Sequence, residues 1–101
     1  MALKIIIRPL AEEDLDDAIC WYNKKKEILG EEFLLEFVET LKIVSLHPLV
    51  FRKRYKQARA FGLKRFPYKI YYLVDDYALH VLAVIHQKRN PKVWKRRIRR
   101  S

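Results

Sequence analysis

The spacing of apolar positions changes from strand-like to helical and back again along the chain. The first segment, Leu3–Arg8, contains three successive isoleucines and is stopped by Pro9, which predicts a short strand covered on both faces. The next apolar residues recur at helical spacing and share one stripe: Ala11, Leu15, Ala18, Ile19 and Tyr22. The acidic residues of this helix follow helical spacing too, and we expect a solvated polar face made by Glu12, Glu13, Asp14, Asp16 and Asp17.

A second helix is predicted from about Glu31 to Pro48, after a break at Gly30. Its broad apolar face consists of Phe33, Leu34, Phe37, Val38, Leu41 and Val44. Because the connection between the two helices is short, they should form an antiparallel hairpin.

From residue 54 onward the pattern changes to strands. Three are predicted, at Tyr55–Phe61, Tyr68–Val74 and Leu79–His86, with a tight turn at 75–78 between the last two. The near-continuous apolar run of Leu79–His86 favours a position inside the sheet. On the strand before it, Tyr68, Ile70 and Tyr72 should face one way, and Lys69 and Tyr71 the other.

The order β-α-α-β-β-β predicts an α+β fold in which a helical hairpin packs on a small, curved antiparallel sheet. With 101 residues the chain forms a single domain, 1–101. Beyond the last strand, Trp94 and Ile98 are four residues apart and could dock a short helix on the body, with the cations between and beyond them, including Arg97, in solvent. A frayed basic tail fits the same residues.

Composition excludes several classes of protein. No apolar run approaches the roughly 20 residues that a membrane span needs, and the first residues do not resemble a signal peptide, so we expect a cytoplasmic protein without a membrane partner. The single cysteine, Cys20, has no second cysteine with which to pair, and we expect it to be a buried small apolar residue.

The charge is divided unequally between the two halves of the chain. Lys and Arg total 22 against 12 Asp and Glu, for a net charge of +10. Residues 1–50 carry 6 basic and 10 acidic groups, a net −4, whereas residues 51–101 carry 16 basic and 2 acidic groups, a net +14. Such a distribution indicates a polyanionic partner, either a nucleic acid or an acidic protein, although a merely solvated basic face would show the same asymmetry.

Few residues suggest catalytic chemistry. The three histidines lie on different elements, and the two glycines are 32 residues apart, so neither a metal site nor a phosphate-binding loop is expected, and no cofactor is implied. His86 ends the last predicted strand just before Lys88 and Arg89, whose charges would lower its pKa and keep it a neutral base. The alternative is a histidine that caps the strand or bonds to the backbone. The tyrosines of the middle strand could stack RNA bases or simply pack.

Five short motifs in a fixed order resemble the bacterial RelE/ParE toxins of type II toxin–antitoxin modules. They are PLAExDLxxAIxWY at 9–22, GExF at 30–33, HP at 47–48, KRFPYxIYY at 64–72 and HxxRNPxxW at 86–94. The resemblance covers nearly the whole chain and implies the fold already predicted. It also implies a growth-inhibiting protein that forms a hetero-oligomer with a small acidic antitoxin, which suits the basic half.

The resemblance implies two different activities. RelE-like members cleave mRNA on the ribosome without a metal. For this chain the resemblance would then imply catalytic roles for His86 and Arg89. The residues that would hold phosphates are Arg59, Lys64, Arg65 and Lys69. Trp94, however, stands near where such enzymes place a tyrosine.

The FPY motif at 66–68 and the ending at 86–94 are closer to the ParE branch, which poisons DNA gyrase. We therefore favour a gyrase-directed toxin in which Trp94, Arg96 and Arg97 contact the target or the antitoxin. A stand-alone nucleic-acid-binding module is a third possibility.

Overall fold

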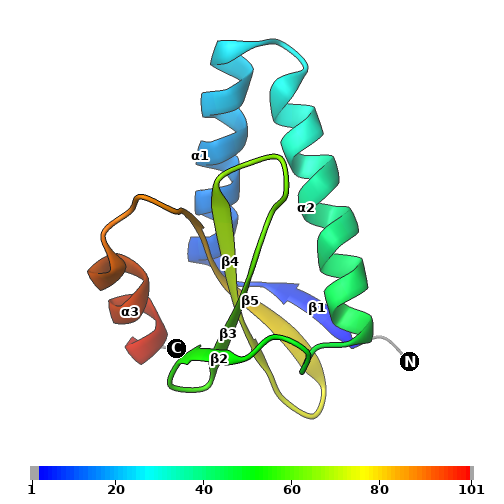
Figure 1. The fold of residues 1–101 in the computed structure, drawn as a ribbon, viewed down its shortest axis with the longest axis vertical. Helices are drawn as coiled ribbons and strands as arrows, with labels where there is room; N and C mark the ends of the chain where they lie inside the picture. Colours follow the sequence, from blue (N-terminus) through cyan, green and yellow to red (C-terminus); the bar gives the residue numbers. More distant parts are fainter. Residues whose placement is uncertain (1–2, 101) are drawn as a thin grey trace.

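The computed structural model describes residues 3–100 and confirms the α+β class (Figure 1). Its elements are β1 (Lys4–Ile7), α1 (Pro9–Lys25), α2 (Leu29–Leu46), β2 (Lys53–Tyr55), β3 (Ala58–Gly62), β4 (Tyr68–Val74), β5 (Ala78–His86) and α3 (Pro91–Arg100). The two long helices form the predicted antiparallel hairpin, and the C-terminal segment is a helix rather than a frayed tail. A local signal explains this helix: the Asn90 side chain accepts a hydrogen bond from the Lys92 N–H at 2.9 Å, and Pro91 occupies the first helical position.

The sheet has five strands in the order β1-β5-β4-β3-β2. β2 to β5 form an antiparallel meander, but β1 pairs parallel with β5, so the prediction of a wholly antiparallel sheet is wrong for this strand. β5 lies inside the sheet, as its apolar run indicates. β1 is an edge strand whose three isoleucines are only half-buried, which corrects the expectation that both of its faces are covered. A run of isoleucines has the same appearance in an edge strand and in an interior strand.

The predicted strand Tyr55–Phe61 is in fact two strands joined by a tight turn. Tyr55 pairs with Ala58, so Lys56 and Gln57 form a two-residue turn between β2 and β3. Lys56 has φ 51°, a left-handed conformation that usually selects Gly or Asn. Because neither residue type is present, the sequence carries no signal for this turn.

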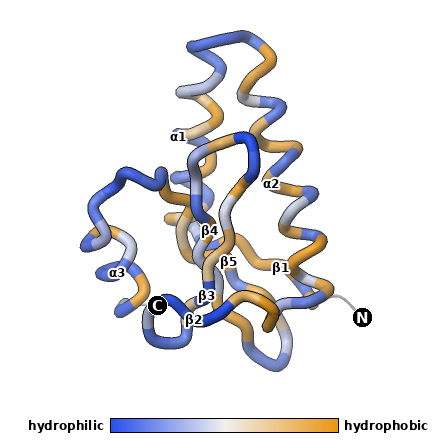
Figure 2. The backbone as a smooth tube through the Cα atoms, viewed as in Figure 1, coloured by the Kyte–Doolittle hydropathy of each residue, from blue (hydrophilic) through white to orange (hydrophobic). Residues whose placement is uncertain are grey.

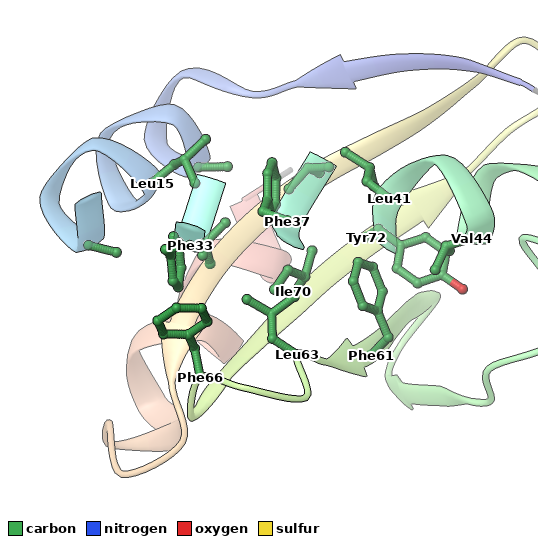
Figure 3. Close-up of a cluster of buried hydrophobic side chains, with 14 of the residues drawn as sticks. Leu15, Phe33, Phe37, Leu41, Val44, Phe61, Leu63, Phe66, Ile70 and Tyr72 are labelled. Carbon is green, nitrogen blue, oxygen red and sulfur yellow. The ribbon is translucent and has the colours of Figure 1, made fainter. Parts of the chain in front are cut away.

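The sheet carries a hydrophobic cluster on each face. The larger cluster lies between the sheet and the α1–α2 hairpin, where Phe33, Phe37 and Leu41 of α2 pack over Ile70 and Tyr72 of β4 (Figure 3). The smaller one lies under α3 and includes Tyr71, Ile85 and Ile98. The alternation predicted for residues 68–72 is confirmed, since Tyr72 and Tyr71 belong to different clusters.

Gly30 lies inside the first turn of α2 rather than at a break between the helices. Its backbone N–H donates to the Asn23 side chain of α1 at 2.9 Å. A Cβ at this position would lie 2.2 Å from Asn23 Oδ1 and 2.7 Å from the Ile19 carbonyl oxygen. Glycine is therefore required where the start of α2 packs against the end of α1.

Cys20 is exposed, which corrects the expectation that it is buried. It lies nine residues after Ala11, and at 100° per residue this places it on the opposite side of α1 from the buried stripe.

Candidate functional site

The functional candidates surround one end of β5, where the strand loses its neighbour on one side. β1 pairs with β5 only from Ala78 to Val81. Beyond Val81 two backbone groups of this β5 edge bond to side chains: Asp14 of α1 accepts from the Val84 N–H at 3.0 Å, and Arg97 of α3 donates to the Leu82 carbonyl oxygen at 3.3 Å. Side chains from both flanking helices thus complete this edge of the strand.

Asp14 and Arg97 also pair with each other. Nη1 of Arg97 donates to Asp14 Oδ2 and Nη2 donates to Oδ1, the latter at 3.3 Å, in a two-point contact. Their side chains are only 15% and 18% exposed, so both predictions of solvated charges are wrong for these two residues. The pair connects α1 to α3 across the edge of β5.

Aromatic packing holds the rest of α3 on the sheet. The Trp94 ring stacks on Tyr71 of β4 with centroids 4.4 Å apart and planes at 17°, and Ile98 is 6% exposed in the same cluster. The predicted docking through Trp94 and Ile98 is therefore confirmed. Burial raises the pKa of the Tyr71 hydroxyl, and the nearby Arg54 opposes that shift. Trp94 thus supports the fold, while Arg96 on the outer side of α3 is exposed.

His86 and Arg89 line a common hollow of about 360 Å³ between α1 and the ends of β4 and β5. Tyr68, the cross-strand partner of His86, contributes a ring that meets the imidazole edge-on at 5.3 Å. Desolvation raises the pKa of Tyr68, so the phenol is neutral near pH 7. Asp14, Asp17 and the exposed Trp21 complete the polar lining.

The hydrogen bonding of His86 limits the chemistry of this hollow. Its Nδ1 accepts a hydrogen bond from the Lys88 backbone N–H at 3.1 Å, the backbone contact expected of a strand-capping histidine. In the neutral ring the proton is then on Nε2. Nε2 can donate a hydrogen bond, but it cannot take a proton from a ribose hydroxyl. The neighbouring Asp17 carboxylate would repel a phosphate.

Of the four residues predicted to bind phosphate, Lys64 and Arg65 are neighbours, and Arg59 and Lys69 lie on separate strands. Arg59 on β3 donates to the Phe51 carbonyl oxygen at 2.6 Å. Lys64 and Arg65 lie in the loop between β3 and β4, and Arg65 pairs with Glu32 of α2 at 2.6 Å. Lys69 follows Tyr68 on β4. Because successive side chains of a strand point to opposite faces of the sheet, Lys69 faces the α3 side. None of the four lines the hollow that contains His86 and Arg89.

A second hollow, of about 580 Å³, runs along α2 beside β3. Its floor is apolar and includes Ile43, Val50 and Phe51, all exposed to solvent. Lys64 and Arg65 line it on the side of the sheet. We call this hollow the α2 groove; its remaining lining includes Glu36, Glu39, Thr40, Val44, His47, Phe61 and Gly62.

Other kinds of site find little support. Among residues 3–100, no group of three or more His, Cys, Asp or Glu side chains is placed to hold a metal ion. None of the described helices is both long and apolar enough to cross a membrane.

Sequence reasoning missed the role of Asp14. It lies three residues after Ala11 and four before Ala18, so it borders the buried stripe, whereas Glu12 and Glu13 point elsewhere. The place of Asp14 at the border of the buried stripe was the only sign in the sequence that its carboxylate is not solvated, because its partner Arg97 is 83 residues away.

The comparisons agree with this fold and with the motifs. The family model of the ParE toxin of the type II toxin–antitoxin system parDE matches residues 5–91. A search of curated proteins found no match. Among solved structures, a chain of the chromosomal ParDE system from P. aeruginosa is similar, with a TM-score of 0.74 and 17% sequence identity over 84% of this chain and 96% of that chain. The chain belongs to the ParE toxin family of type II toxin–antitoxin systems.

Proposed function

We propose that this protein inhibits bacterial growth by poisoning DNA gyrase and that a small acidic antitoxin neutralises it, as in a plasmid-stabilisation module. The family match over residues 5–91 carries the proposal. The similar chain from P. aeruginosa belongs to a ParDE toxin–antitoxin system, which supports an antitoxin partner.

The α2 groove is the proposed binding site of the antitoxin. Its floor exposes large apolar side chains, with Ile43 65% and Val50 73% exposed, and such a surface is costly to leave in water. Lys64 on the sheet side offers a charge to a carboxylate of the partner, whereas Arg65 already pairs with Glu32. An amphipathic, acidic segment would cover the apolar floor and pair with Lys64.

The hollow of His86, Arg89 and Tyr68 is the observation that favours the alternative, a ribosome-dependent ribonuclease. Two features count against it: the bonded Nδ1 of His86, which removes a general base, and the separation of the four phosphate-binding candidates from the hollow. Gyrase poisoning requires neither feature, because the toxin need not perform the chemistry itself.

Two purified reactions test the proposal. With gyrase and supercoiled plasmid, wild-type protein should trap cleaved DNA, and a variant with His86→Ala and Arg89→Ala should do the same if it folds. In a translation reaction, wild-type protein should leave the mRNA intact. Truncated mRNA that disappears with the double variant, together with no cleaved plasmid, would establish the ribonuclease instead.

A further inference from the structure

The outer side of α3 presents one unbroken row of cations. Lys92, Lys95, Arg96 and Arg99 are three or four residues apart, so they share one stripe of the helix, and all four are exposed. We call them the α3 stripe. The opposite side faces the protein through Val93, Trp94, Arg97 and Ile98.

The turn between β2 and β3 continues this cationic surface. The Lys95 and Lys56 amines lie 5.6 and 5.9 Å from the centroid of the Tyr55 ring, so the turn and α3 meet at this ring. Arg54 is close enough to Tyr71 to oppose the rise in its pKa. Figure 2 shows hydrophilic residues over β2 and over the segment that leads into α3.

Lys56 occupies a backbone conformation that costs energy for a lysine. Its φ of 51° lies in the left-handed region, where Gly or Asn would be favoured. A lysine placed there keeps a cation at the tip of the turn. Backbone strain of this kind is often retained where a side chain has a function.

The distribution of exposed apolar side chains indicates the class of partner. Among residues 3–99, eleven of the twelve large hydrophobic residues that are exposed lie between Leu10 and Phe51, and the twelfth is Tyr77 in the turn after β4. Arg96 borders a hollow that also contains the exposed Leu10, but Lys92, Lys95 and Arg99 have no exposed large apolar residue beside them among the described residues of α3. Protein interfaces depend on such anchors, whereas binding to phosphates depends on cations alone.

The aromatic rings beneath the stripe are already occupied. Trp94 is stacked on Tyr71, and the Tyr55 ring meets Trp94 with centroids 6.1 Å apart and planes at 79°. Single-stranded nucleic acids are bound mainly by stacking bases on free aromatic faces. With these faces covered, the surface fits a double-stranded backbone better.

We propose that the α3 stripe and Lys56 bind the phosphate backbone of duplex DNA, without reading its sequence. From Lys92 to Arg99 the stripe extends about 10 Å, over which duplex DNA carries about six phosphates. Contacts made by cations alone predict a steep dependence on salt and little sequence preference.

The test measures anisotropy of a labelled 20-base-pair duplex at several salt concentrations, without gyrase. The variant Lys92→Gln, Lys95→Gln, Arg99→Gln removes three charges and keeps long side chains. Its slope of log affinity against log salt should fall by about 2 to 3, because each phosphate contact contributes about 0.9. Affinity at 0.1 M salt should fall at least about thirtyfold.

A matched control removes three charges from the helical hairpin. Lys24 and Lys26 at the tip of the helical hairpin and Lys42 on α2 are all exposed, and Figure 1 shows the hairpin tip far from α3. Changing all three to Gln should reduce affinity less than about threefold. Equal losses in both variants would mean that net charge alone attracts DNA, and would overturn the proposal.

Lys56→Asn separates loss of binding from loss of folding. Asn tolerates the left-handed conformation, so the melting temperature should stay constant or rise while affinity falls several-fold. Unchanged affinity would overturn the role of Lys56.

A competition experiment decides the class of partner. Single-stranded RNA and polyglutamate are each added at the same concentration of charge as the duplex. If either one displaces the duplex, the proposed specificity for duplex DNA is refuted. Because gyrase is absent, this result is independent of gyrase poisoning.

Discussion

Removing the carboxylate of Asp14 should loosen α3 and lower the stability of the whole domain. In Asp14→Ala, Arg97 loses its carboxylate partner and the Val84 N–H loses its acceptor. Breaking a fully buried ion pair costs about 3 to 5 kcal/mol, and an unsatisfied backbone donor costs about 1 to 3 kcal/mol. Because both side chains retain some exposure, 15% and 18%, we expect a total of about 2 to 4 kcal/mol.

A double-mutant cycle isolates the pair. Arg97→Met keeps the apolar part of the side chain and removes the charge. Unfolding in urea should then show that Asp14→Ala and Arg97→Met together cost about 1 to 3 kcal/mol less than the sum of the single changes. As a control, Glu13→Ala, one residue from Asp14 but exposed, should change stability by less than about 0.5 kcal/mol.

Tryptophan fluorescence reports on α3 directly. The chain has two tryptophans, so in a Trp21→Phe background the emission comes only from Trp94. Asp14→Ala should shift this emission toward that of the unfolded chain at a lower urea concentration than in the parent. If the two single changes are additive within about 0.5 kcal/mol, the ion pair does not hold α3 and the reasoning is wrong.

Three further predictions concern single positions. Gly30→Ala places a methyl group against the Asn23 side chain and should lower the melting temperature by more than about 10 °C; an unchanged temperature would mean that the helices separate freely. The pKa of Asp75 is lowered by hydrogen bonds from backbone N–H groups and from His80, so its contribution to stability is present above pH about 4 and is lost as the pH falls through the lower pKa of the folded state. Unfolding curves between pH 5 and 2 should therefore show a smaller acid loss in Asp75→Asn than in wild type, and parallel curves would contradict this. Cys20 should react with a thiol reagent in the native protein; labelling that requires denaturant would contradict its exposure.

The elements with a long periodic pattern could be predicted from the sequence. The stripes of α1 and α2 and the apolar run of β5 each contain enough residues to show their period. The turn at Lys56 could not be predicted, because strand alternation continues through it and no Gly or Asn marks it. The parallel pairing of β1 was also hidden, since pairing direction leaves no trace in a run of isoleucines.

The candidate site was predictable only where its residues are close in sequence. His86 and Arg89 are three residues apart, and they do line one hollow. Tyr68 joins them through strand register, and Asp14 joins Arg97 across 83 residues, which depends on tertiary structure. The basic half of the chain was visible as a composition, but its division into the α3 stripe and the cations beside the α2 groove required the structure.

The central claim is that the α2 groove binds the antitoxin and the α3 stripe binds DNA. Its most direct test is growth under regulated expression, with and without the small acidic protein that we expect an adjacent gene to encode. A variant with Ile43→Glu and Val50→Glu in the groove should still arrest growth but escape neutralisation. The variant Lys92→Gln, Lys95→Gln, Arg99→Gln should lose affinity for the labelled duplex yet still capture the acidic protein in a pull-down. If both variants, shown to be folded, lose duplex affinity and capture together, one surface serves both partners and the account is contradicted.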